Sequence, residues 1–149
     1  MKKRRDPLSR QIAILYRQEQ GVVSSMLSEY NISFSELPFV MELYSKQGVT
    51  QEYLAQKVQV DKANAARSLK QLEKKELITR QSSPNDARAK LVYLTDNAIA
   101  LKSDLVAIID RWNELLTRDI TDEELETVRQ VQRKMMKNVI TCRENNELP

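Results

Sequence analysis

The sequence predicts a mainly α-helical fold with one small β-hairpin, an α+β arrangement built as one unit over residues 1–149. Apolar residues recur at helical spacing along most of the chain. This spacing gives way to short β-type runs only at residues 77–81 and 90–94. A chain of this length buries roughly two-thirds of its unfolded surface, so its core needs no disulfide, and the lone Cys142 has no partner within the chain.

The first expected helix covers residues 8–30 and is amphipathic. Gly21 lies inside it and costs about 1 kcal/mol relative to Ala, which makes this the point where the helix can kink. The apolar residues at helical spacing are Leu8, Ile12, Leu15, Val22, Met26 and Tyr30.

Two short helices are expected next. Ser33 and Glu36 form a Ser-x-x-Glu capping box, which predicts the start of a helix that ends before Gly48. Thr50 is the following N-cap residue, and it opens a short helix that runs to about Val58.

The fourth helix is expected over residues 61–75, with Asp61 as its N-cap. Its expected buried stripe consists of Ala66, Leu69 and Leu72. The side chains that point elsewhere are cationic or hydrogen-bonding, so the outer face of this helix is chemically suited to a polyanion.

A two-stranded hairpin is expected after this helix. The runs 77–81 and 90–94 are β-type, and the turn-rich segment 82–88 between them contains Pro84 and Asn85. The hairpin therefore has a polar tip.

Two more helices complete the chain within residues 96–142. Helical spacing returns after Thr95 and continues for about six turns. Thr121 and Glu124 form a second capping box, which starts the last helix. Its apolar stripe consists of Leu125, Val128, Val131, Met135, Val139 and Ile140.

Positive charge is concentrated in two parts of the chain. Residues 1–20 hold six basic and two acidic side chains, and residues 50–95 hold nine and five. The other two segments are net negative. Such a distribution is typical of a polyanion-binding surface, although a solvated face has the same composition.

The composition excludes most enzyme classes. Histidine is absent, which removes the commonest general base and metal ligand, and two glycines cannot form a Gly-rich phosphate loop. We therefore expect no catalytic residue, no cofactor and no metal site. No apolar run is long enough for a membrane span, and the basic residues 1–5 are not followed by a signal-peptide core, so we expect a cytoplasmic protein.

Two short helices joined by a tight turn and followed by a hairpin form a winged helix-turn-helix, here expected over residues 33–95. In this arrangement helix 61–75 enters the major groove of DNA, and the wing at residues 82–90 reaches the minor groove. Asn64 is suited to adenine, and Ala65 to a thymine methyl. Arg67 can bind guanine or phosphate.

At the tip of the wing, Asp86 lies two residues before Arg88. We expect its carboxylate to orient the Arg88 guanidinium for entry into the narrow minor groove. The full set of candidate DNA-binding residues is Thr50, Gln51, Lys62, Asn64, Ala65, Arg67, Ser68, Gln71, Ser83, Asp86, Arg88 and Lys90.

The segment from Val60 to Thr95 resembles the multiple-antibiotic-resistance-regulator (MarR) family of bacterial winged-helix transcription factors. The resemblance rests on the Val-Asp-Lys that begins at Val60, the Leu-Glu-Lys-Lys that begins at Leu72, and the Leu-Ile-Thr-Arg that begins at Leu77. It also rests on the Asp-Ala-Arg-Ala-Lys-Leu-Val-Tyr-Leu-Thr that begins at Asp86, in which the Asp-x-Arg of the wing followed by Leu-Thr is the strongest part. Glu76 and Ala98 depart from the family pattern, which commonly has Gly at both positions. Because Glu adopts the left-handed conformation that ends a helix less readily than Gly, we expect the helix before Glu76 to end differently.

The resemblance implies that residues 8–30 and 96–142 interlock two copies into a homodimer, and that Thr50 and Gln51 brace the DNA backbone. A two-fold dimer would read a palindromic operator, with half-sites about 34–36 Å apart on double-stranded DNA. The family also implies repression that is relieved by a small aromatic or anionic effector.

A protein-interaction module is the alternative function, in which the winged unit keeps its shape while the long helices bind and antagonise another regulator. Its marker would be DNA binding without sequence preference or salt dependence. An enzyme is the weakest hypothesis, because the chain offers only Asp and Glu pairs on solvated helices.

Overall fold

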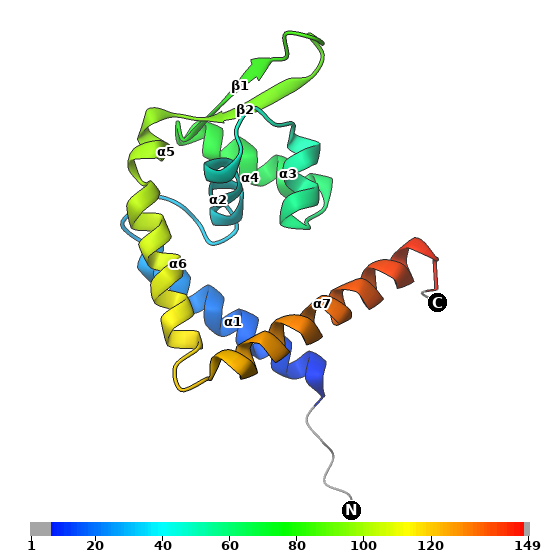
Figure 1. The fold of residues 1–149 in the computed structure, drawn as a ribbon. Helices are drawn as coiled ribbons and strands as arrows, with labels where there is room; N and C mark the ends of the chain where they lie inside the picture. The colour runs from blue at the N-terminus through cyan, green and yellow to red at the C-terminus, as the bar shows by residue number, and fades with distance from the viewer. Residues whose placement is uncertain (1–6, 148–149) are drawn as a thin grey trace, which may run out of the picture. The chain divides into compact units, whose positions relative to one another are not determined.

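The computed structural model describes residues 7–147, and the basic run at residues 1–5 lies outside them. The chain divides into two compact units between Trp112 and Asn113. Its helices and strands, labelled in Figure 1, are α1 (Leu8–Leu27), α2 (Leu37–Ser45), α3 (Gln51–Val58), α4 (Lys62–Lys74), β1 (Ile78–Ser82), β2 (Lys90–Leu94), α5 (Asp96–Ala100), α6 (Lys102–Leu116) and α7 (Asp122–Glu144). None of the described helices is both long and apolar enough to cross a membrane.

The first unit contains the winged helix-turn-helix. Strands β1 and β2 pair antiparallel in a register that runs from Ile78 opposite Leu94 to Ser82 opposite Lys90. A bridge between Val49 and Val92 joins the segment before α3 to the same hairpin. The fold class expected from the sequence is therefore confirmed.

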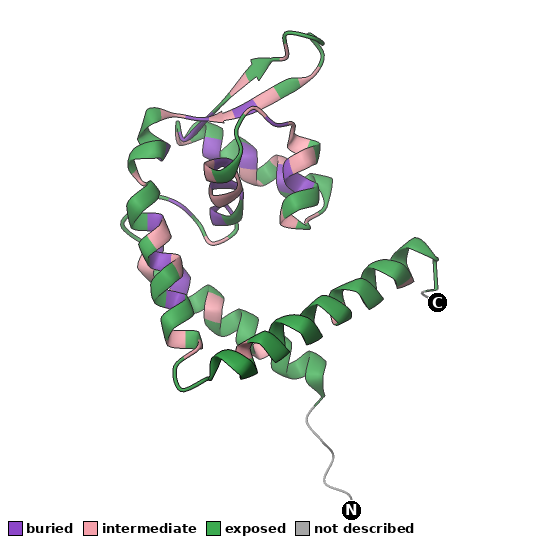
Figure 2. Ribbon diagram, viewed as in Figure 1, coloured by how far each residue is buried: buried purple, intermediate pink, exposed green. Residues whose placement is uncertain are grey.

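The core of this unit is apolar and continuous, as the buried segments in Figure 2 show. Helices α2, α3 and α4 and both strands contribute to it. Its largest fully buried side chains are Phe39, Leu27, Leu43, Leu54, Leu69, Leu72, Ile78, Leu105, Val23, Val40 and Val92. This shared core fixes α4 and the wing on one scaffold.

The N-caps expected from the sequence form where the helices begin. Thr50 Oγ1 accepts a hydrogen bond from the Tyr53 N–H at 3.1 Å, and Asp61 Oδ1 accepts from the Asn64 N–H at 2.7 Å. The capping box of Thr121 and Glu124 is complete at the start of α7. Each cap satisfies donors that the first helical turn leaves without a partner.

The box of Ser33 and Glu36 forms, but the expected helix start is three residues early. Glu36 Oε2 accepts from the Ser33 N–H at 2.9 Å, and Ser33 Oγ accepts from the Glu36 N–H at 3.3 Å. These bonds close a turn, and α2 begins at Leu37. The Leu37 N–H donates to the carbonyl of Ser33 at 3.1 Å, but Pro38 has no N–H to donate to the carbonyl of Phe34, so the helical bonding is interrupted in the first turn.

Two further expectations need correction. Helix α1 ends at Leu27 instead of residue 30, and it continues through Gly21 without a break. The alanine of α4 that is buried with Leu69 and Leu72 is Ala65, which is 0% exposed, whereas the expected Ala66 is half-buried. Both alanines are at helical distance from Leu69, so spacing alone did not distinguish them.

The expected six-turn helix after Thr95 is divided at Leu101 into α5 and α6. The carbonyl of Ala98 accepts a hydrogen bond from the Leu101 N–H at 3.2 Å and from the Tyr44 hydroxyl at 2.5 Å. Burial raises the pKa of Tyr44 above its usual value. The break thus coincides with a contact between α2 and the end of α5.

Glu76 adopts the left-handed conformation that glycine would adopt there, with φ of 58°. The Leu77 N–H donates to the carbonyl of Leu72 at 2.9 Å, and the Thr95 hydroxyl donates to the carbonyl of Glu76 at 2.7 Å. Helix α4 therefore ends in the left-handed manner despite the side chain.

Candidate nucleic-acid interface

Helix α4 is held in place by one face and presents the other to solvent. Ala65, Leu69 and Leu72 are each 0% exposed and lie in the core. The polar and small side chains around the rest of the helix are exposed: Lys62, Ala63, Asn64, Arg67, Lys70, Gln71, Glu73 and Lys74. A rigid helix with such a face matches the requirements of a major-groove reader.

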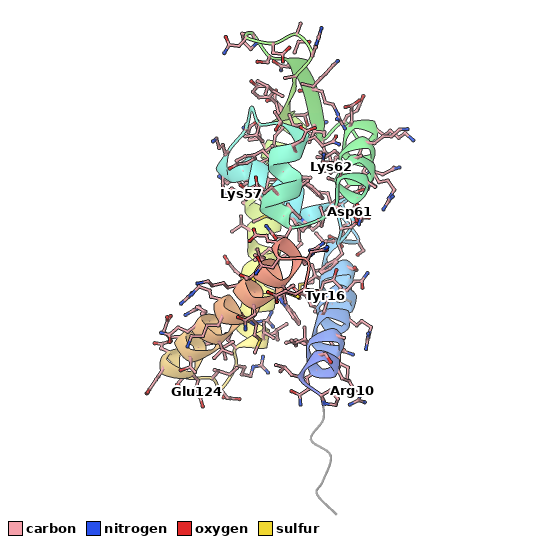
Figure 3. The ribbon with its side chains drawn as sticks, turned by 90° about the vertical axis from the view of Figure 1, so that its right-hand side faces the viewer. Arg10, Tyr16, Lys57, Asp61, Lys62 and Glu124 are labelled. Atoms are coloured by element: carbon pink, nitrogen blue, oxygen red, sulfur yellow. The ribbon has the colours of Figure 1, made fainter. Side chains whose placement is uncertain are left out.

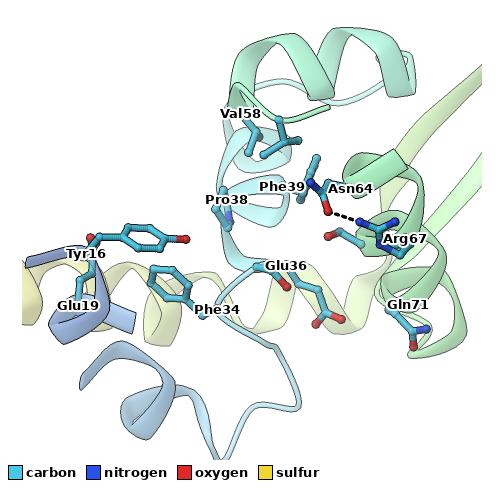
Figure 4. A pocket seen from close by; sticks show the side chains of 13 residues that line it. Tyr16, Glu19, Phe34, Glu36, Pro38, Phe39, Val58, Asn64, Arg67 and Gln71 are labelled. Carbon is cyan, nitrogen blue, oxygen red and sulfur yellow. Dashed lines mark hydrogen bonds between the residues drawn. The ribbon is translucent and has the colours of Figure 1, made fainter. Parts of the chain in front are cut away.

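The N-terminal turn of α4 contains a chain of side-chain hydrogen bonds. Asn64 Nδ2 donates to Asp61 Oδ2 at 2.7 Å, and Arg67 Nη2 donates to Asn64 Oδ1 (Figure 4). The N-cap carboxylate thus orients Asn64, which in turn orients the Arg67 guanidinium. Asn64 keeps one amide hydrogen and one carbonyl lone pair for a base edge.

Ala65 does not belong to this surface. Its side chain is 0% exposed, so the expected contact with a thymine methyl is wrong. Ala63 is the alanine with an exposed methyl group at the start of α4, and Lys70 and Lys74 lie on the same outer side. None of these three residues was among the candidates expected from the sequence, although a turn of 100° per residue places them about 100–140° around the helix from Leu69.

Gln51 and Arg80 connect the first helix of the motif to the wing. Arg80 Nη1 donates to Gln51 Oε1 at 2.9 Å, and Arg80 Nε donates to Glu73 Oε2 at 2.8 Å. Strand β1 is therefore tied to both α3 and α4 through one guanidinium. Because Arg80 occupies the amide oxygen of Gln51, the amide nitrogen is the group left for a phosphate oxygen.

The tip of the wing is organised by backbone contacts. The Ser83 N–H donates to the carbonyl of Ala89 at 2.9 Å, and the Arg88 N–H donates to Asp86 Oδ1 at 2.9 Å. Between residues 7 and 147 no hydrogen bond or ion pair joins the Asp86 carboxylate to the Arg88 guanidinium. Asp86 thus shapes the turn instead of holding the guanidinium, and that expectation needs correction. The Arg88 side chain is exposed.

The remaining candidates differ in exposure. Lys90, at the start of β2, is exposed, whereas Ser68 and Ser83 are half-buried. Thr50 uses its hydroxyl oxygen as the cap of α3. The candidate residues therefore lie on α4, at the start of α3 and on the wing, and Ala65 is the one among them whose side chain is fully buried.

A cavity of about 690 Å³ opens beside α4, and Figure 4 shows its lining. Asn64, Arg67, Ser68 and Gln71 line it from α4. Aromatic rings form another part, where Tyr16 and Phe34 meet edge to face with centroids 5.7 Å apart. The residues in the described part of the chain form no cluster of three or more potential metal ligands.

Glu36, at the edge of this cavity, is buried and paired. Its Oε2 lies 2.7 Å from Lys75 Nζ, and the two side chains are 5% and 23% exposed. The pair connects the turn before α2 to the C-terminal end of α4. It therefore fixes the end of the helix opposite the Asp61 cap.

The helix pair, the hairpin and the exposed face of α4 define a winged helix-turn-helix protein. The MarR family model matches residues 32–90 of this chain. A MarR transcriptional regulator from Methanosarcina mazei Go1 is 28% identical, with a TM-score of 0.80 over 90% of this chain and 96% of that chain. Residues 32–90 thus resemble the MarR family of winged-helix transcriptional regulators, and the chain shares the fold of its solved members.

Two further solved structures share the fold. MepR from S. aureus, solved in a DNA complex, is 24% identical with a TM-score of 0.85, over 89% of this chain and 98% of that chain. A mutant MarR from E. coli, complexed with operator DNA, is 24% identical with a TM-score of 0.80, over 87% of this chain and 93% of that chain.

Proposed function

We propose that this protein is a sequence-specific DNA-binding repressor of transcription that reads an inverted repeat as a homodimer. The observation that carries the proposal is the capped helix α4, which exposes Arg67, Lys70 and Lys74 on a face held rigid by its buried side. The solved DNA complexes of MepR and of the mutant MarR support it through the shared fold. Such a regulator acts on the chromosome, in the bacterial cytoplasm.

Each part of the surface has a distinct role in this proposal. The exposed methyl of Ala63 and the side chains of Asn64 and Arg67 read base edges in the major groove. The amide nitrogen of Gln51 contacts a phosphate oxygen, which positions the motif without reading sequence. Arg88 enters the minor groove from the wing, where the negative potential is strongest in narrow A·T tracts.

Two observations support the dimer. Helix α7 has no buried residue in the described chain, yet it carries Val128, Val131, Met136, Val139 and Ile140, which are 40–58% exposed. Helix α1 likewise exposes Leu8, Ile12, Leu15 and Tyr16 at 50–56%. Apolar faces of this size are covered in a partner chain, and a two-fold axis between copies would match a palindromic operator.

The effector site in this proposal is the cavity of about 690 Å³ beside α4. Its volume and aromatic lining suit a small aromatic molecule, and Arg67 can receive a carboxylate there. A bound effector would then occupy Asn64, Arg67 and Gln71, the groups that also read DNA. Binding of the two ligands would be mutually exclusive, which satisfies the requirement for differential affinity.

Selection from a random duplex pool at fixed salt tests the central proposal. Enrichment of an inverted repeat with half-sites about one helical turn apart is expected. Failure to enrich any sequence would contradict specific DNA recognition. With the selected duplex, titration of benzoate against benzamide tests the effector site, because only the anion is expected to displace DNA, and Arg67→Ala should abolish that difference.

A further inference from the structure

Two lysines from different elements lie over the ring of Tyr53. Lys46 Nζ is 5.1 Å and Lys57 Nζ is 5.7 Å from the ring centroid. Lys46 directly follows α2, and Lys57 is one turn beyond Tyr53 on α3. The tyrosine is half-buried and both lysines are exposed. We call Lys46, Tyr53 and Lys57 the lysine–tyrosine cluster.

The positive charge of this cluster has no counterion within the described chain. Neither ammonium group forms an ion pair or a hydrogen bond with any residue between 7 and 147, although Glu42 and Glu52 lie on the same two elements. The two ammonium groups lie over one ring at distances that place them within about 11 Å of each other, and the Debye length at physiological ionic strength is about 8 Å. Their mutual repulsion is therefore only partly screened, and an anion placed between them would relieve it.

The cluster lies apart from the base-reading surface. Gln51 and Tyr53 are two residues apart on α3, which separates their side chains by about 200° around the helix axis. Gln51 faces the wing through Arg80, so Tyr53 and Lys57 lie on the other flank of α3. Figure 3 shows Lys57 on one side of α3 and Asp61 and Lys62, at the start of α4, on the other.

We infer that the lysine–tyrosine cluster is a second phosphate-binding surface, which contacts the backbone of the duplex that α4 reads. This inference rests on the proposed DNA binding. Lysine binds phosphate as a point charge, and the tyrosine ring holds both ammonium groups near one place without neutralising them. The cluster offers no apolar groove or planar fork that would recognise a particular protein surface, so it supplies affinity that is independent of base sequence.

The test is the salt dependence of DNA affinity for the full chain. We compare wild type with the double variant Lys46→Gln and Lys57→Gln on the selected operator and on an unrelated duplex. Each lost phosphate contact should lower the slope of log K against log salt by about 0.9. Between 50 and 200 mM salt, the ratio of wild-type affinity to double-variant affinity should therefore fall about twelvefold on both duplexes.

The chain offers a matched control. Lys102 lies over the ring of Tyr44 at 5.7 Å, the same kind of contact on α6, and Lys102→Gln should leave the slope unchanged. Tyr53→Phe keeps the ring and should also leave it unchanged. Circular dichroism of each variant establishes that it is folded.

The outcomes separate the two proposals. Equal slopes for wild type and the double variant on an operator that wild type binds specifically would overturn the phosphate-binding surface and favour an acidic protein as its partner. Loss of slope in the double variant, with wild type binding all sequences equally, would support the surface and contradict specific recognition. An equal loss of slope in Lys102→Gln would also overturn the inference, because the effect would then follow from net charge alone.

Discussion

The ion pair of Glu36 and Lys75 predicts an asymmetry between its two partners. The carboxylate is 5% exposed and accepts two hydrogen bonds, from Lys75 Nζ at 2.7 Å and from the Ser33 N–H at 2.9 Å. The lysine side chain is 23% exposed and retains access to water. Removing the lysine therefore leaves a buried charge with one donor, whereas removing the carboxylate charge leaves an ammonium that water can still reach.

The magnitudes follow from this difference in burial. Loss of one partner from a fully buried pair costs about 3–5 kcal/mol, and the partial exposure of Lys75 places Lys75→Met near the lower end, at about 3 kcal/mol. Glu36→Gln retains a side-chain acceptor for the Ser33 N–H, and it should cost about 1 kcal/mol. In a chain of this size these values correspond to decreases in Tm of roughly 6–12 °C and 2–4 °C.

Thermal unfolding followed by circular dichroism measures both variants. Lys74→Met is the matched control, because Lys74 is exposed on the same helix and forms no ion pair in the described chain; it should change stability by less than about 0.5 kcal/mol. Equal destabilisation by Lys75→Met and Glu36→Gln would refute the argument from buried charge. A Lys74→Met variant as unstable as Lys75→Met would refute it as well, since helix propensity would then explain both.

Three other predictions follow from single contacts. Gly48→Ala should destabilise the protein by about 1–2 kcal/mol in urea unfolding, because φ is 67° and an added Cβ would lie 3.0 Å from the hydroxyl of Tyr93; no loss would show that the turn relaxes. Arg88→Ala should weaken operator binding about tenfold or more in a titration at fixed salt, while unfolding is unchanged because the side chain is exposed; wild-type affinity would remove the wing from the interface. Burial raises the pKa of Tyr44, so the stability that its protonated hydroxyl contributes is present below pH 10 and is lost as the pH rises through the pKa of Tyr44 in the folded protein. Between pH 9 and 11, Tyr44→Phe should therefore lose less stability than wild type. Parallel profiles of stability against pH would contradict this.

The elements of the fold were predictable because their signals are local. Thr50, Asp61 and Thr121 each begin a helix within one residue of the expected position, since a cap and its acceptor lie within one turn. The alternating runs on both sides of the polar tip predicted the hairpin for the same reason. The helix start after Ser33 was wrong because the box signal is compatible with a turn as well as a helix.

Contacts between distant segments were not predictable from spacing. Gln51 and Arg80 are 29 residues apart, and Glu36 and Lys75 are 39 apart. Nothing in the local pattern indicates that these side chains meet, because their positions depend on how α2, α3, α4 and the hairpin share one core. The exchange of Ala65 for Ala66 has the same origin, since the packing neighbours decide which of two adjacent small residues is buried.

The wing and the reading helix behave as one body because a single guanidinium connects them. Arg80 Nε contacts Glu73 on α4, and Arg80 Nη1 contacts Gln51 at the start of α3. A phosphate that binds the amide nitrogen of Gln51 therefore also affects the orientation of α4 and of β1. Backbone contact and base reading are coupled in this arrangement, and a wing that moves must break a hydrogen bond to α3, to α4 or to both. The hydrogen bond from Arg80 to the amide oxygen of Gln51 thus keeps the amide nitrogen available for DNA and also restrains the orientation of the wing relative to α3.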